Sequence, residues 1–199
     1  MVGVTLLVGG LLGLVLGLTL FATRRDGLFQ NRPVFVALNF LVNLVRPIPF
    51  VIFLMAVRPL NVAVMGTFIG VKGALLPMVI MCSMATSRLV EQSLVNTDPG
   101  IIEAGRAMGA SRLHVLFRIL IPEALAPLIL GYVFLIIGIL DMSAMAGVVG
   151  AGGLGAFAIQ YGYQKYNDYV MYAGVAAIVL LVQIVQTFGN WLARRVLHR

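Results

Sequence analysis

The most polar stretch of the chain, residues 98–123, carries the side chains best suited to work outside an apolar environment. Asp98 and Pro99 predict the start of a helix, because aspartate caps free backbone N–H groups and proline fits the first helical position. Gly109 allows the left-handed residue that ends such a helix, and Ser111 can cap a second one. No nucleophile–base pair or pair of carboxylates stands in a plausible catalytic arrangement. The stretch therefore predicts a mechanical role, as a helical hairpin that a partner protein can push.

Each helix of this hairpin has an expected apolar face. In the first helix, the i, i+3, i+4, i+7 spacing selects Ile101, Ala104, Gly105 and Met108. In the second helix, the same reasoning selects Leu113, Leu116, Phe117 and Leu120. Gly105 and Ala104 keep the first face flat, so the two helices are expected to approach closely.

The hairpin resembles the EAA loop of the permease subunits of type-1 ABC importers. The match consists of Glu103, Ala104, Gly105, Gly109, Ile119, Ile121 and Pro122, with Gly105 in place of the usual alanine and Ile121 in place of the usual leucine. The resemblance implies a coupling helix that docks in a groove of a separate ATPase. The residues implied in coupling are Glu103, Ala104, Gly105, Arg106, Ala107, Met108, Gly109, Ala110 and Pro122. The alternative is an ordinary cytoplasmic helical hairpin.

Three ionisable residues lie in or beside apolar segments, where a charge is expensive and indicates function by default. Arg46 and Pro49 form an Arg-x-x-Pro pattern similar to amino-acid-type permeases, and Arg46 either lines a path or snorkels to the headgroups. Asp141 needs a partner in the outer half of its segment, and Lys72 is the nearest cation in expected depth. We therefore predict that Lys72 and Asp141 face each other. Arg88 and Glu91 are three residues apart and are expected to pair along one helix.

A glycine-rich run at 147–155 formally contains G-x-G-x-x-G, but no strand precedes it and no βαβ unit surrounds it. The dinucleotide-binding interpretation is rejected on that ground. Irregular backbone at membrane depth is tolerated where it lines a cavity or is packed in protein, so the run predicts a looped turn at the outer mouth. The candidate residues of a translocation path are Met142, Met145, Arg46 and Gly150. Ordinary helix packing is the alternative for both methionines.

The composition requires a lipid environment, because 61% of the 199 residues are hydrophobic and only 11% are charged. A spanning helix needs about 20 apolar residues. The chain is predicted to be an all-α polytopic membrane protein, a single transmembrane domain over residues 1–199. Its expected spans are 2–22, 34–57, 72–94, 124–147 and 169–192, with the coupling loop at 98–123.

Two of these spans carry specific expectations. Pro47 and Pro49 should bend the second span. The third span begins either near Val62 or near Lys72, and the later start is preferred because it keeps Lys72 at the interface.

The first span is interpreted as a retained helix, because it lacks a basic leader and a cleavage site. Gly9, Gly13 and Gly17 recur every four residues along it. Such a stripe of small residues lets helices touch closely, within the subunit or between copies. Packing within the subunit is the preferred interpretation.

The distribution of basic residues predicts the orientation in the membrane. Ten of the fourteen lysines and arginines lie in the 23–33 loop, the 86–123 region and the C-terminal tail. Arg58 and Lys165 are the two in loops on the opposite side. The positive-inside rule then places the coupling loop and the C-terminus in the cytoplasm and the N-terminus outside the cytoplasmic membrane.

The sequence predicts a transport subunit and not an enzyme. No G-x-x-x-x-G-K-[ST] motif occurs, and Cys82, His114 and His198 are too isolated for a metal site. The net charge of +7 sits in loops and does not indicate nucleic acid. The resemblance implies that ATP and Mg²⁺ bind a partner chain. It also implies a second copy of this subunit, two ABC ATPase subunits and a periplasmic or lipid-anchored substrate-binding protein, working by alternating access.

The substrate is suggested by a resemblance to methionine-uptake permeases. The matching residues are Gln160-Tyr161-Gly162-Tyr163 with Tyr166 and Asn167, together with Arg46-Pro47-Ile48-Pro49-Phe50 and Glu103 to Gly109. This resemblance implies L- or D-methionine. The alternatives are a type-1 permease for another small solute, such as glycine betaine or another amino acid, and a non-transporting scaffold. A channel or proton-coupled carrier is a further alternative, but a carrier would show inverted repeats and midplane ionisable residues.

Overall fold

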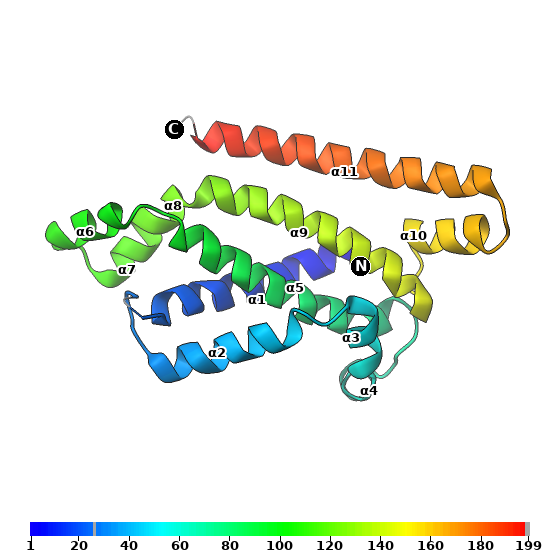
Figure 1. Ribbon diagram of the computed structural model, residues 1–199, viewed down its shortest axis with the longest axis horizontal. Helices are drawn as coiled ribbons and strands as arrows, with labels where there is room; N and C mark the ends of the chain where they lie inside the picture. Colours follow the sequence, from blue (N-terminus) through cyan, green and yellow to red (C-terminus); the bar gives the residue numbers. More distant parts are fainter. Residues whose placement is uncertain (26, 198–199) are drawn as a thin grey trace.

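The computed structural model describes residues 1–25 and 27–197, and every regular element in these ranges is a helix (Figure 1). Four helices are long and apolar enough to cross a bilayer: α1 (Val2–Thr23), α5 (Gly70–Val95), α9 (Leu125–Met145) and α11 (Asp168–Leu197). The predicted all-α polytopic architecture is confirmed. Arg199, which was counted among the basic residues of the tail, lies outside the described residues.

The second predicted span is not one continuous helix. It consists of α2 (Arg32–Val45) and α3 (Phe50–Ala56), whose axes meet at 107°. Pro47 and Pro49 lack the N–H groups that would continue the ladder, and their rings clash with the preceding turn. The break that these prolines predict is confirmed.

The third span starts where the later of the two alternatives placed it. A separate short helix, α4 (Arg58–Met65), ends at Gly66, whose φ of 73° is left-handed. The side-chain amide of Asn61 donates to the carbonyl of Gly73, which fastens α4 to the first turn of α5. Lys72 consequently lies at the exposed beginning of α5.

The remaining elements are short and connect the long helices. The hairpin between α5 and α9 consists of α6 (Pro99–Ala107), α7 (Arg112–His114), the π-helix η1 (Val115–Leu120) and α8 (Ile121–Glu123). After α9 come the 3₁₀ turn η2 (Ala146–Val149), α10 (Leu154–Phe157) and the π-helix η3 (Ala158–Tyr163).

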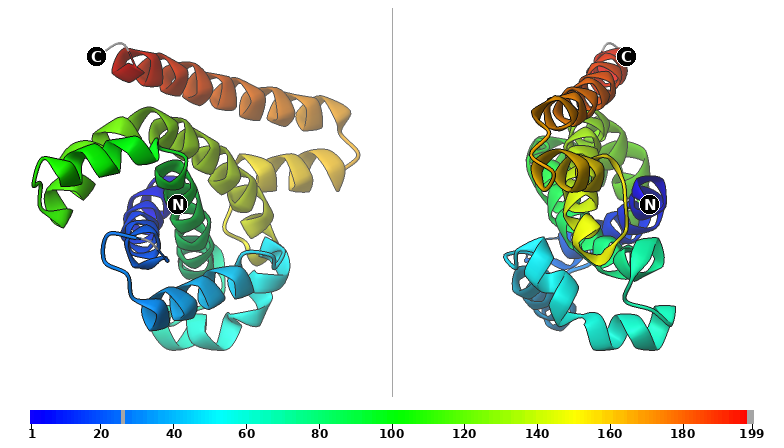
Figure 2. Two further views of the ribbon diagram at one scale, coloured as in Figure 1. Left: turned by 60° about the vertical axis from the view of Figure 1, so that its left-hand side comes forward. Right: turned by 90° about the vertical axis from the view of Figure 1, so that its right-hand side faces the viewer.

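Helices α1, α5 and α11 run in one direction and α2 and α9 in the other, so the connections gather at two ends (Figures 1 and 2). The α6–α7 hairpin, the α1–α2 connection and the C-terminal end of α11 lie at one end. The α3–α4 segment, α10 and the connection into α11 lie at the other. The three basic regions that the sequence assigned to one side of the membrane therefore share one end of the described chain.

The glycine stripe of α1 packs against α5 within the chain. A Cβ atom added to Gly9 would lie 2.8 Å from the Cβ of Cys82, and one added to Gly17 would lie 2.6 Å from the Cβ of Val90. Contacts this short leave no room for a side chain, so the two backbones touch almost directly. This geometry supports the interpretation of the stripe as packing within the subunit.

We expect Gly17→Ala to lower the melting temperature of the detergent-solubilised subunit. The new methyl would lie 2.5 Å from the carbonyl oxygen of Ser87 as well as meeting Val90, so α1 and α5 must separate, at a cost of about 1–3 kcal/mol. Gly3→Ala is the matched control, because no atom lies within 4 Å of its added Cβ. Equal melting temperatures for the two variants would contradict close packing of the helices.

Candidate functional site

The hairpin between α5 and α9 begins and turns as the local sequence predicted. The Asp98 carboxylate accepts a 2.8 Å hydrogen bond from the N–H of Gly100, and Pro99 occupies the first helical position. Gly109 has a φ of 77°, and the Ser111 hydroxyl accepts a hydrogen bond from the N–H of His114 at 3.3 Å. These caps fix the two arms of the hairpin at a defined angle.

Close contact at one glycine joins the two arms. Gly105 is the buried residue of α6, and a Cβ atom there would lie 3.0 Å from the Cδ1 of Ile119 and 3.3 Å from the Cγ2 of Val115. Val115 belongs to a core cluster that also contains Val90 of α5 and Leu128 of α9. Packed side chains therefore connect α6 to two spanning helices.

The expected apolar faces of the hairpin are only partly right. Met108 is 77% exposed, because α6 ends at Ala107 and Met108 stands on the turn. Leu113 and Phe117 are 58% and 53% exposed, whereas Val115 and Leu120 are buried. The second arm is π-helical, with hydrogen bonds from i to i+5, so residues five apart share a face. The 3.6-residue period used for the sequence does not apply there.

Most of the predicted coupling residues form a free surface at the tip of the hairpin. Glu103, Ala104, Arg106, Ala107, Met108 and Gly109 are exposed, and Ala110 is half-buried. Pro122 is exposed in α8, at the other end of the second arm and close to the start of α9. The tip is thus available to a partner protein, while Gly105 and the second arm anchor it to the bundle.

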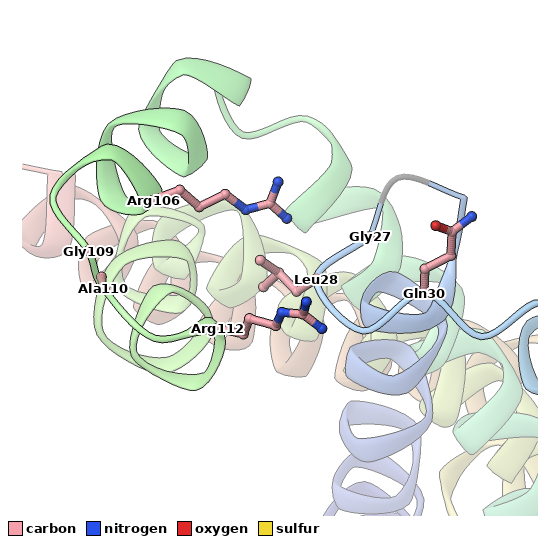
Figure 3. A pocket seen from close by; sticks show the side chains of 7 residues that line it. All are labelled: Gly27, Leu28, Gln30, Arg106, Gly109, Ala110 and Arg112. Carbon is pink, nitrogen blue, oxygen red and sulfur yellow. The ribbon is translucent and has the colours of Figure 1, made fainter.

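A polar cavity of about 510 Å³ lies between the tip and the α1–α2 connection (Figure 3). Arg106 and Arg112 extend into it from the hairpin, opposite the segment that carries Leu28 and Gln30. The Arg112 guanidinium is 5.9 Å from the centre of the Phe29 ring, within cation–π range. The sequence analysis missed this site, because the two segments meet only in the fold. The clustering of arginines on one predicted side was the available signal.

A second polar cluster ties α2 to α5. Arg88 forms a 2.5 Å salt bridge with Glu91, so the predicted pair is confirmed. Arg88 also donates 2.6 Å hydrogen bonds to the side-chain oxygens of Asn39 and Asn43. The sequence analysis missed both asparagines, although two amides four residues apart in an apolar helix were a usable signal. Val42, on the turn between them, is the buried residue of α2.

The candidate path residues lie at different depths and do not form one cluster. Met142 packs against a core cluster that includes Met78 and Ile139, which favours its interpretation as ordinary helix packing. Met145 is 36% exposed, and Arg46 is exposed at the break after α2. Gly150 has a φ of 75° and borders a cavity of about 480 Å³, which Gln160 and Gln164 also line. This arrangement agrees with the expectation that irregular backbone lies beside a cavity.

The predicted pairing of Lys72 with Asp141 does not occur as a salt bridge among the described residues. Over residues 1–25 and 27–197 the salt bridge is that of Arg88 with Glu91, and both Lys72 and Asp141 are exposed. Asp141 borders an apolar cavity of about 410 Å³ whose lining includes Ile178 and Leu181 of α11.

Comparison with known proteins identifies the family. Residues 9–198 match the family described as the inner membrane component of binding-protein-dependent transport systems. The chain is 39% identical to the probable D-methionine transport system permease protein MetI of Vibrio cholerae, over all of this chain and 88% of that protein. It is 36% identical to the methionine import system permease protein MetP of Bacillus subtilis, over 87% of this chain and 78% of that protein.

Solved structures agree with this assignment. A chain of the MetNI methionine ABC transporter in an inward-facing conformation superposes with a TM-score of 0.93 at 36% identity, covering 98% of this chain and 91% of that one. An amino acid ABC transporter shares the fold at 18% identity, with a TM-score of 0.76. The relatives are named permease proteins, which confirms the prediction of a transport subunit distinct from the ATPase. The chain belongs to the family of inner membrane components of binding-protein-dependent transport systems.

Proposed function

We propose that this chain is the permease subunit of an importer that carries methionine across the cytoplasmic membrane. The observation that carries the proposal is the agreement, along the whole chain, with proteins named as methionine permeases. Both D-methionine and methionine appear in those names, so either isomer is a candidate substrate. In this proposal the path includes Gly150, which has a left-handed φ of 75°, and Met145, which is 36% exposed.

The importer contains two copies of this subunit, two ATPase subunits that hold ATP and Mg²⁺, and a binding protein that delivers the substrate from outside. The N-terminus is external, and the hairpin and the C-terminus are cytoplasmic. Closure of the ATPases moves the hairpin tip, whose coupling residues run from Glu103 to Ala110. Packing of Gly105 against Ile119 and Val115 then transmits the movement to α5 and α9. The transport path then opens alternately to the two sides of the membrane.

We expect proteoliposomes with this subunit, its ATPase and its binding protein to accumulate radiolabelled methionine only when ATP is supplied. L-methionine, D-methionine and glycine betaine are tested in parallel, because the binding protein and the path together set the choice of solute. Uptake of glycine betaine in preference to methionine would contradict the proposed substrate. Uptake driven by a proton gradient without ATPase subunits would contradict the proposed coupling.

A further inference from the structure

We propose that the cavity between the hairpin tip and the α1–α2 connection is a binding notch for a carboxylate of the ATPase subunit. We call it the arginine notch and define it by Arg106 and Arg112, with Leu28 at its base. The inference rests on the proposed function, because the ATPase is the partner that docks on this hairpin. It adds a specific chemistry to that contact: an aspartate or glutamate side chain held between two guanidinium groups.

The notch has the geometry that carboxylate recognition requires. Its volume of about 510 Å³ leaves room for a side chain from another protein. Arg106 and Arg112 come from the two arms of the hairpin and reach the same space (Figure 3). A guanidinium presents paired N–H donors that match the two oxygens of a carboxylate. Within the described part of the chain, neither arginine forms a salt bridge, so their charges are not neutralised there.

The surroundings of the notch add to its positive potential. Gln30 also borders a neighbouring cavity of about 520 Å³, which Arg25 and Arg32 line. The Nε of Arg24 is buried and has no hydrogen-bond partner among residues 1–25 and 27–197. Glu103, the nearest acidic residue of α6 in sequence, is exposed and is not among the residues that line the notch. Like charges gathered in one place favour a negatively charged partner and accelerate its approach.

The composition of the tip favours a protein partner over an anionic lipid. Met108 is 77% exposed beside Gly109, and Leu113 is 58% exposed beside Arg112. Arginine and methionine are enriched at protein–protein interfaces, where apolar anchors exclude water around charged pairs. Apolar side chains and unpaired arginines on the same tip therefore fit a protein surface that carries an acidic residue.

The test measures the affinity of the ATPase subunit for the permease in nanodiscs of neutral phosphatidylcholine. We expect the double variant Arg106→Gln and Arg112→Gln to bind the ATPase about 10- to 100-fold more weakly, with most of the difference lost at high salt. Arg118→Gln is the matched control. It removes one of the two charges that the double variant removes, from the same hairpin, at an exposed position that does not line the notch; we expect less than about a twofold change, and each single notch variant is compared with it.

A photoreactive probe attached to Ala110→Cys identifies the partner residue. We expect the cross-linked ATPase peptide to contain an aspartate or glutamate whose amide variant reproduces the weaker binding of the double arginine variant. If the wild-type subunit binds the ATPase and the double variant binds equally well, the arginine notch is refuted while the proposed function stands. If the wild-type subunit does not bind the ATPase at all, the proposed function itself fails.

Two further outcomes would overturn the inference. The variants could differ from wild type only in nanodiscs that contain phosphatidylglycerol, which would assign the notch to a lipid headgroup. Alternatively, Asp26→Asn could reproduce the loss of affinity, which would assign the carboxylate to this chain.

Discussion

We expect Gly105→Leu to lower ATP-driven uptake by about 5- to 150-fold, the range that corresponds to a typical coupling free energy between two sites. Gly105 is buried between α6 and the second arm of the hairpin, where an added Cβ already meets Ile119 at 3.0 Å and Val115 at 3.3 Å. Three further carbon atoms cannot fit without moving α6 away from the second arm. Val115 belongs to the core cluster shared by α5 and α9, so α6 would lose its contact with that cluster. The tip would then move without displacing α5 and α9.

Two controls separate this effect from a general loss of folding. Gly105→Ala should retain uptake, because its methyl meets mainly the mobile end of the Ile119 side chain and alanine favours a helix. Gly138→Leu adds the same bulk to α9 at a position with no atom within 4 Å of the added Cβ. Uptake is compared with basal ATP hydrolysis and with the amount of subunit in the membrane. Normal uptake by Gly105→Leu would show that the contact does not transmit movement.

Much of the fold follows from hydropathy and from local chemistry. Helices α1, α5, α9 and α11 could be predicted from their long apolar segments, because a helix must have that length to cross a bilayer in any fold. Asp98, Gly109 and Ser111 were assigned correctly because capping depends on near neighbours in the chain. The break after α2 was expected from its prolines. The angle of 107° between α2 and α3 could not be predicted, because the direction of α3 depends on tertiary packing.

The parts that could not be predicted depend on rotation about helix axes and on contacts between distant segments. Hydropathy does not give the side of a helix on which a residue lies, and among the described residues no salt bridge joins Lys72 to Asp141. The faces of the second hairpin arm were misassigned because a π-helix changes the period. The arginine notch joins α6 and α7 to the α1–α2 connection, which no local pattern brings together.

We expect Arg88→Met to produce the largest loss of stability among single substitutions of charged residues in this chain. Arg88 makes a salt bridge with Glu91 and hydrogen bonds with Asn39 and Asn43. Apolar packing between helices gains little in lipid, so polar contacts carry much of the attachment of α2, whose buried residue is Val42. Glu91 is 8% exposed, and without Arg88 its charge would be buried and unpaired.

Breaking a fully buried ion pair costs about 3–5 kcal/mol, and we expect roughly 2–4 kcal/mol here because the Arg88 side chain is 22% exposed. Thermal unfolding in nanodiscs measures the loss, and Arg118→Met, an exposed position, should stay within about 0.5 kcal/mol. Adding Glu91→Gln to Arg88→Met should restore part of the stability, because the second change removes the unpaired charge. Arg88→Lys should be intermediate, since one ammonium group cannot reproduce the planar fork that serves three acceptors. Equal stability of the single and double variants would mean that the charge of Glu91 does not depend on Arg88, and the loss would then come from the hydrogen bonds to Asn39 and Asn43.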